Sequence, residues 1–88
     1  MLDVRYSTQY KKDMKMCARR NYDMDLIKQV INILRIPKPL PPKYVNHGVS
    51  GKYKGYQECH VTPDWLLVYK YDNDDLLLYR TGTHSDLF

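Results

Sequence analysis

The pattern of apolar and polar positions in the first third of the chain predicts a short strand and two helices. Residues 2–6 alternate weakly, as in a strand. Ser7 or Thr8 can cap a helix that continues to about Arg20. Asp23 can cap a second helix, whose apolar positions repeat every 3.6 residues and so predict a side that faces the core. The apolar face of the first helix comprises Tyr10, Met14, Cys17 and Ala18, and that of the second Leu26, Ile27, Val30, Ile31 and Leu34.

The remaining residues predict an extended connector followed by three strands. Residues 36–42 contain four of the five prolines, a density that excludes a helix or a central strand. Strands are expected over residues 53–61, 65–71 and 76–81, with turns at 62–64 and 72–75. Short turns between successive strands favour an antiparallel meander. We therefore expect one α+β domain over residues 1–88, in the order β-α-α-β-β-β, with both helices packed on one face of an antiparallel sheet.

Composition supports a small globular domain and argues against a membrane protein. The chain has 88 residues, of which 43% are hydrophobic and 27% charged. Its longest apolar runs, 65–69 and 76–79, fall far short of the roughly 20 residues that span a bilayer. The first residues show no signal-peptide pattern, so a cytoplasmic location is expected. Cys17 and Cys59 lie in no metal-binding spacing and are expected to be reduced core residues.

Charge is distributed unevenly along the chain. Residues 1–56 carry a net charge of +8, whereas residues 57–88 carry −4. A basic N-terminal portion is suited to a polyanion or an acidic partner, although solvated helix faces would explain it equally well. Within the first helix, four basic residues form a ridge: Lys11, Lys12, Lys15 and Arg19.

Three histidines in the second half of the chain are the main candidates for chemistry. His47 follows the proline-rich connector, His60 ends the first strand of the meander, and His84 lies in the tail. Asp64 lies in the turn after His60, and these positions can meet at one rim of an antiparallel sheet. Because histidine titrates near neutral pH, two histidines and a carboxylate can supply a general base and a general acid. Cleavage of RNA through its 2′-OH needs this pairing.

Cations and aromatic residues surround these histidines in the sequence. Lys52, Lys54 and Arg80 can bind phosphate. Aromatic rings can stack on bases, although most are expected to pack in so small a domain; the candidates are Tyr53, Tyr56, Trp65 and Phe88. A zinc site built from the histidines and Asp64 is a competing hypothesis, but no short ligand spacing supports it. We therefore expect neither a metal nor another cofactor.

Three spaced motifs resemble one known family. They are H-x-x-x-G-x-Y-K-G-Y from residue 47, C-H-V-x-P-D-W from residue 59, and R-T-G-T-H-S-D-L-F from residue 80. With the opening Y-S-T-Q-Y-K-K-D-M-K and the proline-rich connector, essentially the whole chain resembles the YafQ branch of the RelE/ParE toxin superfamily. The resemblance implies a RelE-like fold and a bacterial type II toxin that cleaves mRNA in the ribosomal A site. It also implies metal-independent acid–base chemistry with the 2′-OH as nucleophile.

The resemblance assigns roles to individual residues. It implies that His84 is the general acid, that His60 or His47, oriented by Asp64, is the base, and that Phe88 positions a nucleotide. Arg80, Lys52 and Lys54 would stabilise phosphate charge, and Trp65 would contact RNA with them. Gln57 departs from the family, since relatives commonly have arginine at this position.

Partners follow from the same resemblance. It implies a cognate antitoxin that forms a complex with the toxin and alone contacts operator DNA, with the ribosome and mRNA as the other partners. The basic ridge would dock on ribosomal RNA or on the antitoxin. Two alternatives are a non-enzymatic ParE-like inhibitor of DNA gyrase and a catalytically silent module that binds RNA or antitoxin.

Overall fold

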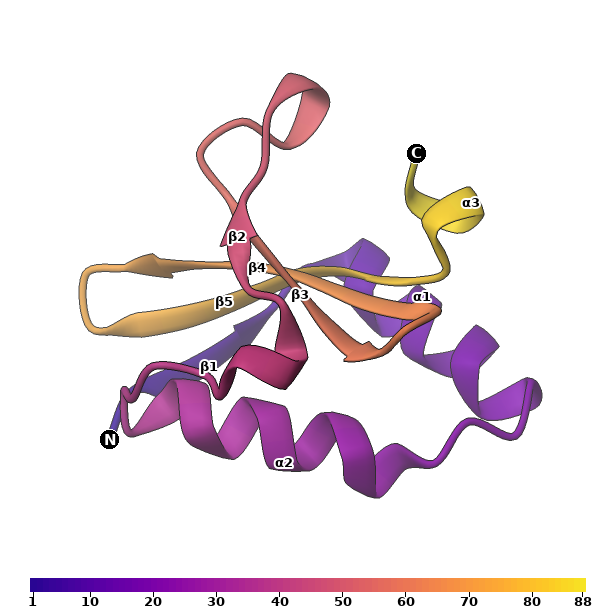
Figure 1. The fold of residues 1–88 in the computed structure, drawn as a ribbon, viewed down its shortest axis with the longest axis horizontal. Helices are drawn as coiled ribbons and strands as arrows, with labels where there is room; N and C mark the ends of the chain where they lie inside the picture. Colours follow the sequence, from indigo (N-terminus) through magenta and orange to yellow (C-terminus); the bar gives the residue numbers. More distant parts are fainter.

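A computed structural model describes residues 1–88 as a five-stranded sheet with two long helices on one side (Figure 1). The α+β class and the expected order of the main elements are confirmed. The elements are β1 (Asp3–Tyr6), α1 (Thr8–Arg19), α2 (Met24–Arg35), the 3-10 turn η1 (Pro42–Tyr44), β2 (His47–Gly48), the 3-10 turn η2 (Gly51–Tyr53), β3 (Gln57–Thr62), β4 (Trp65–Asp72), β5 (Asp75–Gly82) and α3 (His84–Leu87).

The sheet has the strand order β1-β5-β4-β3-β2. Strands β3, β4 and β5 form the expected antiparallel meander, whereas the edge strand β1 pairs with β5 in parallel, which the expected antiparallel sheet did not include. The apolar pattern of a strand does not encode the direction of its partner. The first meander strand begins at Gln57 and not at Tyr53, because the glycines before it adopt positive φ angles of 70° at Gly51 and 92° at Gly55.

Both long helices begin at the predicted caps. The Ser7 hydroxyl accepts a hydrogen bond from the backbone N–H of Tyr10 at 2.9 Å, and the Asp23 carboxylate accepts one from Asp25 at 3.0 Å. The helices then bury an apolar side against the sheet. The buried core on this side includes Tyr10, Cys17, Ile27, Val30 and Leu34 from the helices and Cys59, Val61, Trp65, Leu67, Tyr69, Leu76 and Leu78 from the sheet.

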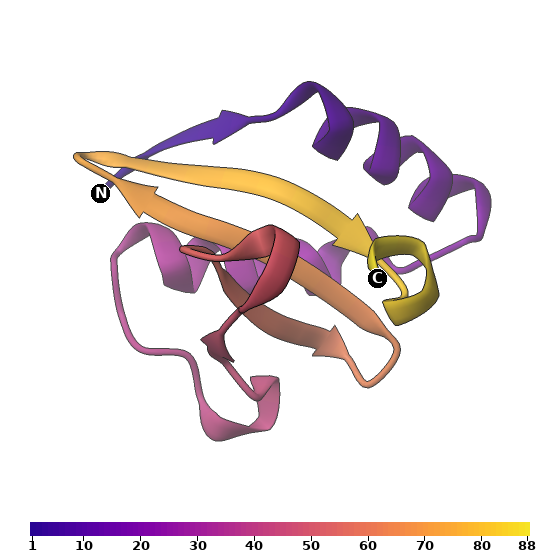
Figure 2. The same ribbon diagram turned by 90° about the horizontal axis from the view of Figure 1, so that it is seen from above.

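The opposite face of the sheet has a much thinner cover. Its small apolar cluster consists of Tyr53, Leu66, Val68 and Leu87, and only the η2 turn and α3 lie over it (Figure 2). Because side chains alternate along β3, Cys59 faces the helices while Glu58 and His60 face this second side. We call it the open face. No helix of the structure is long and apolar enough to cross a membrane.

Candidate functional site

Two histidines and a buried carboxylate meet on the open face. The Nε2 atom of His47, on β2, lies 3.1 Å from Oε1 of Glu58, on β3, and Nε2 of His60 lies 3.8 Å from the same oxygen. The two imidazole rings are 6.5 Å apart, centre to centre. The antiparallel register His47↔Glu58 brings these residues together. We call these three residues the histidine–glutamate cluster.

The hydrogen bonds within the cluster distinguish its two histidines. Nδ1 of His47 lies 2.9 Å from the carbonyl oxygen of Gly48, so both ring nitrogens of His47 face an oxygen acceptor. The ring of His60 makes no hydrogen bond and is partly exposed. Glu58 is 6% exposed, and its position holds the His47 ring in a fixed orientation. The His60 ring is therefore less tightly held than the His47 ring, with Glu58 as its nearest charged neighbour.

The third histidine approaches from the C-terminal end of the chain. His84 begins α3, and its ring stacks on that of the terminal residue Phe88, with a centroid distance of 4.8 Å and an interplanar angle of 28°. The sheet register aligns His60 with Leu66 and Leu66 with Gly82. Two strand spacings of about 4.8 Å therefore separate the backbone of His60 from that of Gly82. Figures 1 and 2 both show α3 at the same end of the sheet as the β3–β4 turn.

Arg80 is held between the edge of the sheet and the open face. Its Nε and Nη2 atoms donate to the buried carboxylate of Asp13 at 2.8 and 3.2 Å, and its Nη1 atom lies 3.3 Å from the hydroxyl of Tyr53. These contacts raise the pKa of Arg80, chiefly through the hydrogen bond to Asp13. The Nη1 atom thus contacts Tyr53, a residue of the apolar cluster on the open face.

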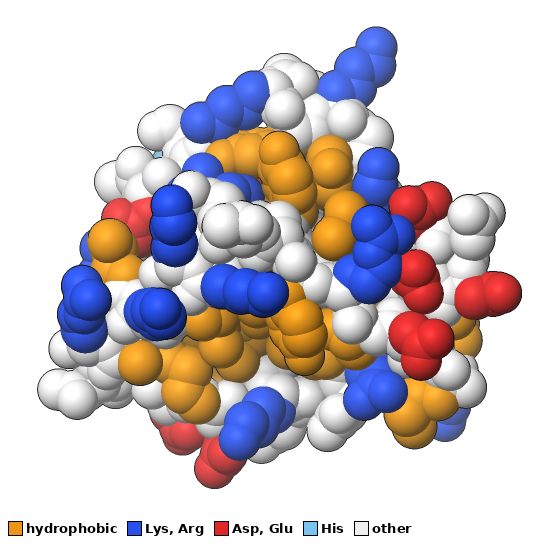
Figure 3. Space-filling model, turned by 180° about the vertical axis from the view of Figure 1, so that it is seen from behind, with side chains coloured by type: hydrophobic (Ala, Val, Ile, Leu, Met, Phe, Trp, Pro, Cys, Tyr) orange, Lys and Arg blue, Asp and Glu red, His pale blue; other side chains and the backbone are white.

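Other predicted cations lie on the surface. The Lys52 ammonium group lies 5.1 Å from the centre of the Tyr53 ring, and Lys54 is exposed on the same loop. The ridge residues Lys11, Lys12, Lys15 and Arg19 are all exposed on α1. From behind, Lys and Arg side chains surround a hydrophobic strip (Figure 3). A groove of about 590 Å³ between α1 and α2 has Lys11 and Lys28 among its lining residues.

Two sequence-based expectations need correction. Asp64 is exposed, shares a hollow with Tyr22 and Asp23, and makes no hydrogen bond or ion pair with a histidine; Glu58 occupies the orienting position instead. Trp65 is only 2% exposed and faces the helices, where its Nε1 atom donates to the Thr81 hydroxyl at 2.7 Å. It therefore packs in the core, and its ring is closed to an RNA base.

The position of Gln57 also changes the expected significance of its substitution. Its side chain lies on the opposite side of β3 from Glu58 and His60, where its Oε1 atom accepts a hydrogen bond from Asn46 at 3.2 Å. Any side chain at position 57 leaves β3 on its helix-facing side and is therefore directed away from the histidines.

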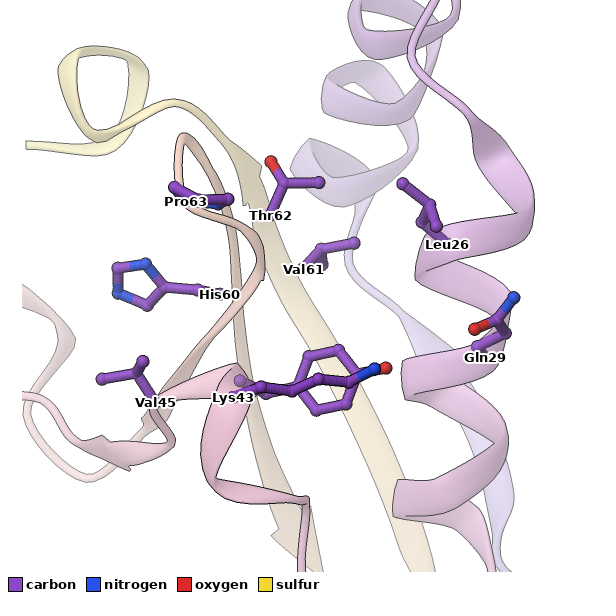
Figure 4. Close-up of a pocket in the computed structure, with 9 residues that line it drawn as sticks. Leu26, Gln29, Lys43, Val45, His60, Val61, Thr62 and Pro63 are labelled. Carbon is purple, nitrogen blue, oxygen red and sulfur yellow. The ribbon is translucent and has the colours of Figure 1, made fainter.

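A cavity of about 570 Å³ adjoins the cluster from the other side of β3. Figure 4 shows Val61 directed toward Leu26 and Gln29 of α2, whereas His60 points away from them. Lys43 and Val45 of the η1 segment close another wall. His60 is thus at the boundary between this cavity and the open face.

The histidine–glutamate cluster also has the composition of a metal site. The ligand atoms of its three residues all lie within 4.8 Å of one another. Two imidazole nitrogens and a carboxylate oxygen are suited to zinc or copper, and further coordination positions would remain for solvent. Glu58 was not among the residues predicted for the site, so this grouping was not expected. The alternation of side chains along a strand could have revealed it, since Glu58 and His60 are two residues apart.

Comparisons with known proteins agree on one family. Residues 2–88 match the family described as "Bacterial toxin of type II toxin-antitoxin system, YafQ". The mRNA interferase toxin YafQ of Escherichia coli K12 is 44% identical over 87 residues, which cover 98% of this chain and 95% of that protein.

Solved structures show the same relationship. The crystal structure of a copper-bound mutant toxin from Helicobacter pylori has a TM-score of 0.95 at 38% identity and covers 100% of both chains. The toxin in the crystal structure of the E. coli DinJ–YafQ toxin–antitoxin complex has a TM-score of 0.90 at 43% identity, covering 99% of this chain and 97% of that one.

Proposed function

The chain belongs to the YafQ family of toxins from bacterial type II toxin–antitoxin systems, and we propose that it cleaves mRNA in the A site of the ribosome. It is an endoribonuclease of the mRNA interferase type, as its relatives are named. The observation that most supports cleavage is the convergence of His47, Glu58 and His60 on the open face, with His84 and Phe88 at the same end of the sheet. Because the proposed substrate is mRNA on the ribosome, the activity is expected in the bacterial cytoplasm.

The proposed reaction is an internal phosphoryl transfer. A general base takes the proton of the 2′-OH, the 2′-oxygen attacks the adjacent phosphorus, and the bond from phosphorus to the 5′-oxygen breaks. A general acid protonates the leaving 5′-oxygen, so the products carry a 2′,3′-cyclic phosphate and a 5′-OH. Charge that develops on the phosphate oxygens requires a cation or hydrogen-bond donors.

The geometry favours particular residues for these steps. His60 is the candidate base, because its ring makes no hydrogen bond in the unbound protein. His84 is the candidate acid, because it is exposed on α3, at the same end of the sheet as the β3–β4 turn. His47, held by Glu58, can donate to the phosphate once substrate displaces its present acceptors, and Arg80 offers its Nη1 edge to the same group. Phe88 is 48% exposed, which leaves its ring edge available to a base.

We propose that this chemistry needs no metal. The histidines already provide a base, an acid and a donor, so no step of the cleavage requires a metal-bound water. The metal-binding geometry of the histidine–glutamate cluster has another consequence: an ion bound there would occupy the nitrogen lone pairs that proton transfer needs. The copper-bound H. pylori toxin shows that metal binding occurs in a relative of this fold.

A cognate antitoxin is the second expected partner. The toxin in the E. coli DinJ–YafQ complex covers nearly this whole chain, so an antitoxin of that kind is the expected neutralising partner here. The exposed ridge Lys11, Lys12, Lys15 and Arg19 would dock on ribosomal RNA when the antitoxin is absent.

Primer extension on a defined mRNA in a purified translation system tests the proposal. Wild-type protein, stripped of metal by EDTA, should cut within codons, whereas His84→Ala should cut about 10²- to 10⁴-fold more slowly. Ser85→Ala is the matched control, because Ser85 is exposed on the same short helix and makes no side-chain hydrogen bond. Equal cutting by His84→Ala and Ser85→Ala would contradict the catalytic assignment. Intact mRNA with all three proteins would exclude the nuclease and direct attention to DNA gyrase.

A further inference from the structure

The position of the candidate acid depends on a helix that cannot be stable by itself. Helix α3 comprises only His84–Leu87, with Phe88 as its C-terminal cap. One turn of helix gains too few hydrogen bonds to offset the entropy of ordering it. The orientation of the His84–Phe88 stack is therefore determined by contacts between α3 and the rest of the protein.

Two of these contacts anchor the C-terminal end of α3. The Leu87 side chain is fully buried with Leu66 and Val68 on the open face. The Tyr53 hydroxyl donates a hydrogen bond of 2.8 Å to the carbonyl oxygen of Leu87. The Tyr53 ring also meets that of Phe88 edge to face, at a centroid distance of 5.2 Å. These contacts hold only the C-terminal end of α3, so the N-terminal part, which carries His84, can unwind unless it is also held.

A single carboxylate holds the first turn. Oδ2 of Asp86 accepts a hydrogen bond of 2.8 Å from the backbone N–H of Thr83, and the Thr83 hydroxyl accepts one of 3.1 Å from the N–H of Asp86. The same carboxylate receives both terminal nitrogens of Arg20, with Nη1–Oδ2 at 2.6 Å and Nη2–Oδ1 at 3.1 Å. The paired guanidinium holds the pKa of Asp86 well below its usual range. Asp86 thus remains a carboxylate at any physiological pH.

Arg20 is at a significant position for this role. It is the residue that caps α1, the helix that carries the exposed basic ridge. Among the ion pairs of the structure, Arg20–Asp86 is the one that joins α1 to α3. Bidentate arginine–carboxylate pairs define an orientation as well as a distance. The pair therefore fixes α3 relative to the helix expected to dock on the ribosome.

We propose that Arg20 is a positioning residue for cleavage: through Asp86 it orients α3 so that the His84–Phe88 stack faces the histidine–glutamate cluster. The catalytic part of this inference rests on the proposed nuclease function. Arg20 itself touches no reacting atom. The conformational part, that Arg20 orders His84 in the unbound toxin, can be decided without any substrate.

Single-turnover cleavage of mRNA on the ribosome tests the catalytic part. Arg20→Ala should lower the cleavage rate at saturating toxin by about 10- to 100-fold, since misplacement of a catalytic group by about 1 Å has this order of effect. The toxin concentration that gives half of the maximal rate should stay within about twofold of wild type, because Arg20 lies outside the basic ridge. Arg20→Lys should be intermediate, since an ammonium group cannot reproduce the bidentate contact.

Arg5→Ala provides the matched control. Like Arg20, Arg5 pairs on the surface with aspartates of another part of the chain. Its Nη1 atom lies 3.4 Å from a carboxylate oxygen of Asp75 and 3.6 Å from one of Asp72, at the opposite end of the sheet. Its cleavage rate and half-saturating concentration should equal those of wild type. A general loss of surface ion pairing would affect both variants, whereas a positioning role affects only Arg20→Ala. Equal cleavage rates for Arg20→Ala and Arg5→Ala would overturn the proposal.

Nuclear magnetic resonance of the unbound toxin provides an independent test. The Phe88 ring, 4.8 Å from the His84 ring, should shift the His84 ring-proton resonances upfield. Arg20→Ala should lose this shift, and Arg5→Ala should retain it. If Arg20→Ala does not fold, the partial loss expected for Arg20→Lys decides the question. Retention of the full shift would refute the proposal even if wild-type protein cleaved mRNA; absence of cleavage by wild type, with loss of the shift in Arg20→Ala, would refute only the nuclease function.

Discussion

Replacement of Asp13 by asparagine should both destabilise the protein and release Arg80 from the site. Asp13 is 8% exposed and accepts four hydrogen bonds: from Gln9 at 3.0 Å, from Arg80 Nε and Nη2 at 2.8 and 3.2 Å, and from the backbone N–H of Thr81 at 3.1 Å. Asparagine retains the size of the side chain but has one acceptor oxygen and no charge. The amide NH2 of asparagine is itself a hydrogen-bond donor, and it would face one of the groups that now donate to Asp13.

The size of the effect follows from the burial of the pair. Removal of one member of a fully buried ion pair costs about 3–5 kcal/mol, because the other charge is left unpaired. The side chain of Arg80 is 20% exposed, so water can compensate part of that loss. We therefore expect a decrease of about 2–3 kcal/mol in the free energy of unfolding. For a domain of 88 residues this lowers Tm by about 10–20 °C.

Urea unfolding followed by tryptophan fluorescence measures this change. Trp65 is the single tryptophan and is buried beside Thr81, so its emission reports the loss of the core next to Asp13. Asp75→Asn is the control, because its partner Arg5 is 56% exposed and the pair should contribute no more than about 0.5 kcal/mol. An Asp13→Asn protein within about 0.5 kcal/mol of this control would show that the reasoning from burial is incorrect.

Three further predictions concern the metal-binding geometry, the thiols and the turn before α3. Micromolar zinc or copper should inhibit cleavage by occupying the histidine–glutamate cluster, and EDTA should restore it; activation by either metal would contradict the metal-free mechanism. Burial raises the pKa of Cys17 to about 11 and that of Cys59 to about 12, from 9.0. Both thiols are therefore buried and protonated at pH 8, so a disulfide reagent should label neither until guanidinium unfolds the chain. The raised pKa values stabilise the folded state below pH 9.0, and this stabilisation is lost as the pH rises through them. Gly82→Ala should lower the free energy of unfolding by about 1–3 kcal/mol in a urea titration. Gly82 has a φ of 153°, and a Cβ there would lie 2.8 Å from the pinned Asp86 carboxylate.

The parts of the fold that could be predicted from the sequence are those with a long repeating pattern. The stripe of α2 and the apolar runs of β4 and β5 extend over many residues, and both helix caps use the expected side chains. Strand β2, with two residues, and α3, with four, are too short to show a periodicity. Both carry candidate catalytic histidines. Their positions follow from pairing and tertiary contacts, which no local pattern contains.

The candidate site, like the fold, could be predicted only in part from the sequence. The three histidines, Arg80 and Phe88 were identified from residue type and motif, but the carboxylate beside the histidines was assigned to Asp64 and not to Glu58. Asp64 is close to His60 in sequence, whereas Glu58 is close in space, because residues two apart on a strand share a face. Asp13 offered a comparable signal. It is a charged residue three positions after Tyr10 in the apolar face of α1, where an unpaired carboxylate would be unfavourable.

Helix α1 emerges as the element that sets the geometry of the open face. Strand β1 ends at Tyr6, opposite Leu78, so the last residues of β5 have no strand beside them on that edge. There Asp13 of α1 accepts a hydrogen bond from the backbone N–H of Thr81 and pairs with Arg80. Arg20, the C-terminal cap of α1, pairs with Asp86. A surface that must admit RNA cannot be covered by a thick apolar layer, so its groups are ordered by hydrogen-bonded ion pairs from the side. Variants of these α1 anchors should therefore reduce cleavage more than they reduce ribosome binding, whereas variants of the basic ridge should do the reverse.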